Sequence, residues 1–408
     1  MWFDLEPEPD PTPLEALDVL VVDCQATASA PHGQLLELGW GWAGPRATAP
    51  RSVLVSLPTG VQVAPAVTRV TGITDAMAAA GASPGQAWDA LCREAVATGR
   101  RSVPTVAHYA RFERPFLAAL GGIPDPLDLV CTHDIARRLL PALPRCSLRA
   151  LAGYFGHGVG PARRSSEHVA STMAVWAGLV GLLRDEGVAT WAGLSAWLRA
   201  PKPPRPGRRV FPMPRELRLS LPDAPGVYRL LRSGGDVLYV GKATSLRRRV
   251  NSYFTHQRGQ HERTLELLSQ VRDVSYERVE SALEAAVVES DEIKRHRPPY
   301  NVALMPDDRR VWFTRPDLGA RADQSSDARP AGPFPSPDLL DAFQALLHGS
   351  PASLGRGRWA PDPGVFADGL AKGRDVWGAP ASGASAGDWW LALGRRLWSA
   401  ERRERGEE

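Results

Sequence analysis

The stretch GVYRLLRSGGDVLYVGK, residues 226–242, decides the fold of the second half of this 408-residue chain. Two short runs rich in apolar and aromatic residues, 226–231 and 236–241, flank the serine-glycine-glycine of residues 233–235. This pattern is typical of two strands joined by a tight hairpin turn. We therefore expect an antiparallel strand pair here, followed by a helix.

Thr244 or Ser245 can cap that helix. Its buried stripe, spaced i, i+4 and i+7, is expected to consist of Leu246, Val250 and Tyr253. Arg249 borders the stripe, whereas Arg247 and Arg248 lie further round the helix. The short strands, the hairpin and the amphipathic helix together predict a small α/β unit.

A later helical segment, SALEAAVVESDEIKRHRPPYN, carries one charged residue on an apolar face. Glu289 shares that face with Ala282, Ala286 and Ile293. A carboxylate at such a position costs free energy unless it is paired or binds a metal ion. From spacing alone, a glutamate at the helix edge that reaches solvent or an arginine is the commoner arrangement.

Taken together and in order, these motifs resemble the GIY-YIG nuclease family. They look most like the N-terminal nuclease module of UvrC, the bacterial excision-repair incision protein, and of its shorter homologue Cho. The resemblance covers about residues 222–303. It is carried by Gly226-Val227-Tyr228, Tyr239-Val240-Gly241, Lys242, Arg249, Glu289 and Pro299-Tyr300-Asn301.

The resemblance implies hydrolysis of phosphodiester bonds with one divalent ion, Mg²⁺ or Mn²⁺, held by Glu289. It implies that Tyr239 is the general base, with Tyr228 beside it. Because a free tyrosine has a pKa near 10, this role requires cations that lower the pKa. The resemblance places Lys242 and Arg249 for that task. Arg249 would also bind the scissile phosphate.

The matching asparagine, Asn301, would orient the substrate or the local hydrogen-bond network.

The first half of the chain contains VLVVDCQAT, residues 19–27, an apolar run that ends in polar residues. Asp23 and Gln25 share one face of the expected strand. With TVAHYARFERPFL (105–117) and EHVAST (167–172), this stretch resembles the DEDDh 3′–5′ exonucleases of the proofreading type. That family has a ribonuclease H-like fold, two metal ions held by four acidic residues, and a histidine as general base.

The resemblance to the exonucleases implies a damaged site. Its matching positions are Asp23, Gln25 in place of a glutamate, Glu113 in place of an aspartate, His168, and Met173 in place of the last aspartate. Glutamine adds no charge, and a thioether is too soft a ligand for Mg²⁺. Neither Glu167 nor Asp185 is suitably spaced to substitute for Met173, and no route for Glu37 can be derived. We expect this domain to be inactive as an exonuclease.

Strand patterns at 19–23, 35–42 and 53–57 precede helical patterns at 84–98, 111–120, 132–140, 146–155 and 166–184. The segment 200–226 holds six prolines before Glu216 and is expected to be a stiff, extended linker. The expected order is an acidic, proline-rich segment (1–15), the exonuclease-like domain (16–198), the linker (199–221), the GIY-YIG domain (222–303) and a C-terminal region of unknown role (304–408). Helical signals at 337–347 and 386–404 predict a mostly helical or irregular tail.

The composition, 43% hydrophobic and 23% charged, is that of a globular multidomain protein. No apolar run is long enough to span a bilayer. The acidic, proline-rich start does not resemble a signal peptide, which predicts a cytoplasmic bacterial protein, associated with the nucleoid when bound to DNA. The four cysteines are far apart, which suggests neither a zinc site nor a disulfide framework.

Positive charge is concentrated in residues 202–263, which hold 14 Lys/Arg against four Asp/Glu. Such clusters favour polyanions through counterion release, although a solvated arginine-rich surface is an equally good explanation of the composition alone. The residues that we expect to contact DNA are Arg208, Arg209, Arg247 and Arg248.

The leading hypothesis is a magnesium-dependent DNA endonuclease of the excision-repair type, with catalysis in 223–303 and the exonuclease-like domain as a binding platform. About a hundred residues follow, too few for the second nuclease and helical hairpins of full-length UvrC-like proteins, so a single incision is expected. A partner that recognises damage and loads the enzyme would fit this role. The alternatives are a non-catalytic DNA-binding repair accessory protein and a dual nuclease with residual exonuclease activity.

Overall fold

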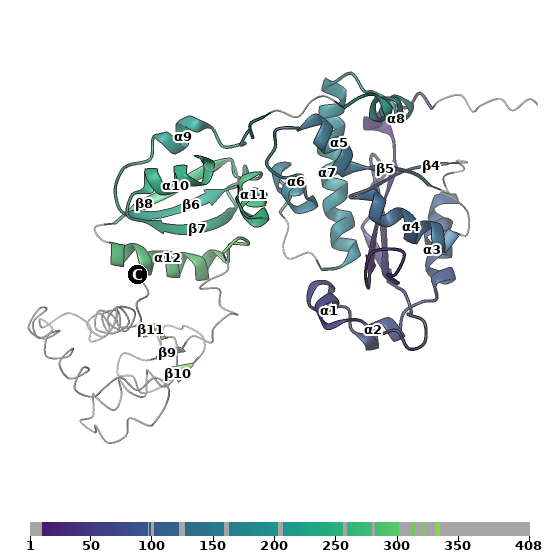
Figure 1. The fold of residues 1–408 in the computed structure, drawn as a ribbon, viewed down its shortest axis with the longest axis horizontal. Coiled ribbons are helices and arrows are strands. Elements are labelled where there is room, and N and C mark those ends of the chain that lie inside the picture. The colour runs from purple at the N-terminus through teal and green to yellow at the C-terminus, as the bar shows by residue number, and fades with distance from the viewer. Residues whose placement is uncertain are drawn as a thin grey trace, which may run out of the picture. The chain divides into compact units, whose positions relative to one another are not determined.

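The structure is a computed structural model, and two units of the chain, 1–301 and 302–408, are described separately (Figure 1). The structure describes residues 10–96, 98, 102–121, 127–158, 163–202, 207–255, 259–279, 282–301, 312–314, 321–322 and 331–334. The first unit contains two separate sheets, each with its own hydrophobic core.

The first sheet has five strands in the order β3-β2-β1-β4-β5. The strands are β1 (Val19–Ala26), β2 (Leu35–Ala43), β3 (Arg51–Leu54), β4 (Val103–Ala107) and β5 (Leu127–Cys131). The first three pair antiparallel, and β4 and β5 continue the sheet in parallel. This mixed α/β order is that of the ribonuclease H-like fold, as the sequence predicts.

Helices cover both faces of this sheet (Figure 1). They are α1 (Pro65–Thr71), α2 (Asp75–Ala79), α3 (Pro84–Val96), α4 (Ala110–Gly121), α5 (Thr132–Leu139), α6 (Leu148–Tyr154), α7 (Ser165–Asp185) and α8 (Trp191–Arg199), after a short 3-10 turn at Leu14–Ala16. Val19 and Val21 pack with residues of α5 to α8, whereas Leu20 and Val22 pack with α3 and α4. Because both faces are covered, the strand is apolar at every position until Asp23.

The second sheet is the antiparallel order β7-β6-β8, with the predicted hairpin at its centre. Its elements are β6 (Gly226–Leu231), β7 (Val237–Ala243), α10 (Leu246–Thr255), α11 (Glu262–Leu268), β8 (Asp273–Arg278) and α12 (Ala282–His296). Gly235 has a φ of +86°, as the turn requires. The Ser245 hydroxyl accepts a hydrogen bond from the backbone N–H of Arg248, so Ser245 is the cap of α10.

The segment expected to be an extended linker is partly folded. It contains the short helix α9 (Arg215–Leu219), and Met213 and Leu221 are buried in the core of the second sheet. The expectation of a wholly extended linker is therefore wrong for this part. The last proline of the run, Pro214, stands just before the helix, where its missing N–H costs nothing.

The described residues of the second unit are strands: β9 (Trp312–Thr314), β10 (Arg321–Ala322) and β11 (Ala331–Phe334), in the order β10-β9-β11. The helical signals at 337–347 and 386–404 lie outside the described residues. Within the part of the chain that the structure describes, no helix is both long enough and apolar enough to cross a membrane.

Candidate active site

The paired strands β6 and β7 bring two tyrosines of the motif together. Tyr228 lies opposite Gly241 in the strand register and is fully buried. A Cβ atom on Gly241 would lie 2.5 Å from the Tyr228 hydroxyl oxygen. The glycine of the Tyr239-Val240-Gly241 motif therefore makes room for the tyrosine of the neighbouring strand.

A third tyrosine, contributed by α10, completes the cluster. The hydroxyl of Tyr253 lies 2.9 Å from that of Tyr228, and its ring centroid lies 6.2 Å from that of Tyr239. The Arg249 guanidinium stands 5.2 Å from the centre of the Tyr253 ring. The sequence predicts Tyr253 only as a core residue, although its position one turn after Arg249 is the signal that places it beside the motif.

Burial raises the pKa of Tyr239 well above 10, and the adjacent Tyr253 raises it further. Arg249 opposes this increase. The pKa of Tyr228 is raised for the same two reasons. Arg249 therefore acts in the expected direction, but burial outweighs it, and the pKa of Tyr239 lies above its usual value in the protein without a metal ion. Both tyrosines keep their protons at neutral pH.

Glu289 is held at the edge of this cluster by one residue of β7. Its carboxylate accepts hydrogen bonds from the backbone N–H of Lys242 at 3.0 Å and from the Lys242 Nζ at 3.2 Å. The Glu289 side chain is 13% exposed. Glu289 therefore has a basic partner, a lysine, yet its carboxylate oxygens keep lone pairs that can face solvent. An anchored carboxylate of this kind fits a hard divalent cation, which prefers oxygen ligands and retains water.

A polar hollow of about 520 Å³ opens at the start of α10 beside Glu289's partner Lys242. Arg248 and Arg249 line the hollow together with small residues. Arg247 is exposed on the same helix, and Arg248 forms an ion pair of 3.5 Å with Asp223. The hollow thus combines positive charge with an open surface, as a phosphate site requires.

Asn301 is buried and does not face the hollow. Its side-chain oxygen accepts a hydrogen bond from the backbone N–H of Val240, and its amide nitrogen donates to the carbonyl oxygen of Val240, both at 2.9 Å. This pair of hydrogen bonds fixes the middle of β7, and so positions Tyr239 and Gly241. Of the two roles expected for Asn301, the structure supports the local network.

The first sheet forms a second pocket, of about 730 Å³, where β1 ends and α4 and α7 begin. Asp23, Gln25, Glu113 and His168 line it, so the structure brings four of the five predicted positions together. The fifth, Met173, packs against the hydrophobic core instead. We call this hollow the strand-end pocket.

Contacts within the strand-end pocket explain the uncharged Gln25. Its side-chain nitrogen lies 3.2 Å from Nδ1 of His168, which also lies 3.3 Å from the carboxylate of Asp23. Glu113 is buried, and burial followed by the charge of Asp23 raises its pKa well above the usual value. Asp23 and Glu113 are the two carboxylates among the five predicted ligands, and two carboxylates supply too little charge for two divalent ions.

None of the other acidic residues considered supplies the missing charge. Glu37 is fully buried, and its carboxylate accepts from the Arg164 guanidinium and from the backbone N–H of Ser165. Glu167 accepts from the backbone N–H of Arg164, where α7 begins. Asp185 ends α7 and lies 3.6 Å from Arg184.

Comparison with known proteins identifies the domain that contains the second sheet. Residues 224–302 match the family model of the UvrC-like GIY-YIG domain. A Mycobacterium tuberculosis protein named as a bifunctional exonuclease/endonuclease is 33% identical over 246 residues, which are 59% of this chain and 36% of that protein. UvrABC system protein C of a Psychrobacter species is 40% identical over 124 residues, 28% of this chain and 20% of that protein. The chain thus spans about a third or less of these relatives.

Solved structures resemble both halves of the first unit. The GIY-YIG endonuclease domain of UvrC from Thermotoga maritima, bound to magnesium, is 33% identical and covers 22% of this chain and 94% of that domain, with a TM-score of 0.20. Exonuclease X bound to 5′-overhanging duplex DNA is 22% identical and covers 41% of this chain and 93% of its own, with a TM-score of 0.32. The chain carries a UvrC-like GIY-YIG domain, and the 246-residue match to the mycobacterial protein reaches beyond it.

Proposed function

We propose that the protein is a divalent-metal-dependent endonuclease that hydrolyses DNA phosphodiester bonds in its GIY-YIG domain. The observation that carries this proposal is the Glu289 carboxylate, anchored by Lys242 beside Tyr239 and Arg249. The Glu289 side chain is only 13% exposed, and burying a carboxylate costs free energy, which a function at this place would explain.

Glu289 would hold the ion, Mg²⁺ or Mn²⁺, through a single carboxylate that leaves room for bound water. When bound, the ion supplies relief of negative charge on the phosphate. Arg249 and Lys242 present further positive charge at the hollow, and Arg249 binds the phosphate. The Tyr239 hydroxyl would orient the attacking water. Tyr239 would first release its own proton to solvent as the positive environment offsets its raised pKa, and the resulting tyrosinate would then accept the proton of the water. Asn301 keeps β7, and therefore Tyr239, in place.

We assign the exonuclease-like domain the role of a DNA-binding platform. Its strand-end pocket keeps the shape of a nucleotide site, but glutamine and a core-packed methionine replace two of the acidic ligands. The lost charge argues against hydrolysis there and leaves binding possible. In this assignment the GIY-YIG domain makes one cut, and the platform selects where.

The names of the relatives support a role in DNA repair of the nucleotide excision type. UvrABC system protein C is one component of a multi-protein system, and the matched module is its GIY-YIG part. We therefore propose a single incision in damaged bacterial DNA, directed by a partner that recognises the damage and loads the enzyme. Neither the lesion nor the position of the cut follows from the site itself.

The test is cleavage of labelled duplex, bubbled and 3′-tailed DNA with Mg²⁺ or Mn²⁺, with products sized on a denaturing gel. We expect internal cuts by the wild type that Glu289→Gln abolishes and Asp23→Asn leaves intact. No cleavage of any substrate with either metal would overturn the proposal in favour of a non-catalytic accessory protein. Stepwise shortening from the 3′ end that disappears in Asp23→Asn would instead show a dual nuclease.

A further inference from the structure

A second basic hollow, distinct from the GIY-YIG site, lies in the first unit and has a volume of about 600 Å³. The residues that we call the arginine pocket are Arg111, Arg137, Arg145, Arg208 and Arg209. They come from the start of α4, from α5, from the loop before α6 and from the segment before α9. No aspartate or glutamate lines the hollow among the described residues.

The segment that carries Arg208 and Arg209 is attached to the first domain by a backbone hydrogen bond. The N–H of Val210 donates to the carbonyl oxygen of Ala142 at 2.9 Å. Although this segment is largely exposed, its residues Arg208 and Arg209 form one wall of the hollow. This placement gives the two basic residues predicted to bind DNA a defined position.

The arginines of the pocket are only partly neutralised by the protein. Arg145 lies 2.8 Å from Glu262, a side chain that is 77% exposed, so the pair is weak. Arg111, Arg137 and Arg208 form no ion pair with any carboxylate that the structure describes. Holding several like charges around one hollow costs free energy that a bound anion would recover.

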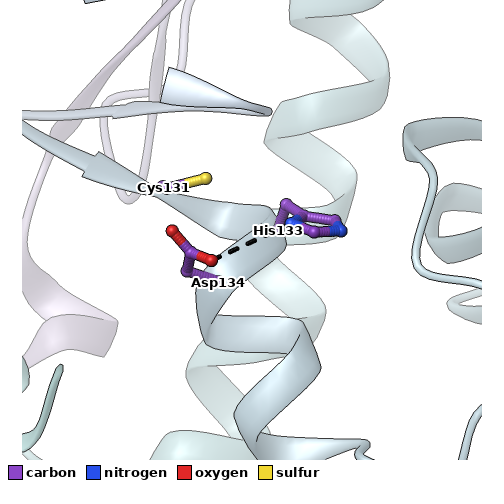
Figure 2. Close-up of side chains that lie close together, drawn as sticks. All are labelled: Cys131, His133 and Asp134. Atoms are coloured by element: carbon purple, nitrogen blue, oxygen red, sulfur yellow. Dashed lines mark ion pairs between the residues drawn. The ribbon is translucent and has the colours of Figure 1, made fainter. Parts of the chain in front are cut away.

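A metal site beside the arginine pocket, with which it shares His133, is the competing interpretation. Cys131, His133 and Asp134 offer ligand atoms within 4.8 Å of one another around the first turn of α5 (Figure 2). Asp134, however, already lies 3.9 Å from the His133 ring and 4.0 Å from the ammonium of Lys202. Nearby arginines also repel a cation: after burial, which is the largest cause, they help to lower the pKa of His133 to about 4. The surroundings favour an anion.

The arginine pocket continues into the strand-end pocket. Tyr109 and Arg111 line both hollows. Tyr109 has a φ of +63°, an uncommon conformation for a residue with a side chain, and its ring lies 4.4 Å from that of His133. Backbone strain at such a position is maintained only where the surrounding structure fixes it. A basic track with half-buried aromatic rings beside it is an arrangement that suits a single strand, whose bases can stack on such rings.

We propose that the arginine pocket binds the phosphodiester backbone of a single nucleic-acid strand that runs from there into the strand-end pocket. A hollow of this size takes a nucleotide-sized group, not a double helix. The inference rests on the proposed function in one respect: it assigns the GIY-YIG domain a substrate with a single-stranded segment next to the cut. The binding itself requires no catalysis.

The test measures binding of the full chain to a fluorescein-labelled 20-mer by anisotropy, in EDTA, across a salt series. The arms are single-stranded DNA, single-stranded RNA of the same sequence, and blunt duplex DNA. The variant Arg111→Ala/Arg137→Ala is compared with Arg69→Ala/Arg93→Ala, which removes the same charge from exposed positions outside both pockets. Arg208→Ala, in an exposed segment, serves if the first double variant does not fold.

We expect the pocket variant to bind single strands about tenfold more weakly or worse, with a salt slope lower by about 0.7 for each phosphate that the protein no longer neutralises. The control variant and duplex binding should change little. Equal weakening in both double variants, or wild-type binding that prefers the blunt duplex, would overturn the proposal. The RNA arm shows whether the sugar is read in addition to the phosphates. Since EDTA removes the metal, an inactive GIY-YIG domain would not affect these outcomes.

Discussion

Two clusters of polar residues in one chain show what turns a carboxylate into a candidate metal ligand. In the GIY-YIG site, Glu289 is anchored by Lys242 and keeps part of its surface open. In the strand-end pocket, Glu113 is buried and its pKa is raised, and the Gln25 side chain contacts the His168 ring. The first cluster combines charge, anchoring and access, whereas the second is a pocket with fewer carboxylates than the exonuclease family has, one of which is buried.

Removing one carboxylate from each cluster tests most directly whether only the GIY-YIG site needs its carboxylate for cleavage. We expect Glu289→Gln to reduce the rate of DNA cleavage by about 10³-fold, because it removes the charge that would hold the ion. Asp23→Asn should leave the rate within about twofold. Both rates are measured under single-turnover conditions with Mg²⁺. An equal loss in the two variants would show that the clusters form one catalytic unit.

The tyrosine cluster gives the next largest effect. Tyr239→Phe should lower the cleavage rate by about 10²-fold, since it removes the hydroxyl that handles the proton of the attacking water. Tyr253→Phe, which deletes a hydroxyl bonded to Tyr228, should cost about tenfold. Rates are compared at matched thermal stability. A smaller loss in Tyr239→Phe than in Tyr253→Phe would indicate that Tyr253, and not Tyr239, has the main role in proton transfer.

Glu37 tests whether the acidic residues of the first domain now serve stability. Glu37→Gln should lower the free energy of unfolding by about 1–3 kcal/mol, because it weakens a buried, hydrogen-bonded ion pair with Arg164. Glu94→Gln, which weakens a surface pair with the exposed Arg51, should cost no more than about 1 kcal/mol. Denaturant unfolding measures both. Cleavage activity that falls while stability is unchanged would contradict the structural role.

The smallest expected effect is a pH dependence confined to the first domain. Burial lowers the pKa of His108 to about 3, whereas the unfolded chain binds that proton near pH 6.5. The unfolded state therefore holds more protons between these values, so this contribution to stability is present above pH 6.5 and declines as the pH falls toward 3. His108→Gln should flatten the decline of the melting temperature between pH 7 and pH 5. An unchanged slope would contradict the assignment.

Much of the fold follows from local patterns in the sequence. The run 19–23 predicts a strand because it is short, continuous and apolar, and the pair 226–231 and 236–241 predicts a hairpin because two such runs flank a glycine-containing turn. Helices α3 to α7 lie within a few residues of their predicted ranges, whereas α1, α2 and α8 are not predicted. By contrast, the sequence patterns do not predict β4 and β5, since short, fully buried parallel strands have no distinctive period. The helix α9 is also not predicted, because the prolines before it dominate the local pattern.

The sequence by itself determined which residue types stand at the motif positions of both sites, and so that one set is intact and the other is damaged. That information is local, because each motif is a short run of consecutive residues or a single residue. Only the tertiary structure decided that Tyr253 joins the tyrosines, that Arg164 takes up Glu37, and that arginines from four segments surround one hollow. Those facts depend on distances between elements far apart in the chain. The burial and the electrostatic surroundings of these residues arise only when the elements pack together, so no single segment of the sequence determines them.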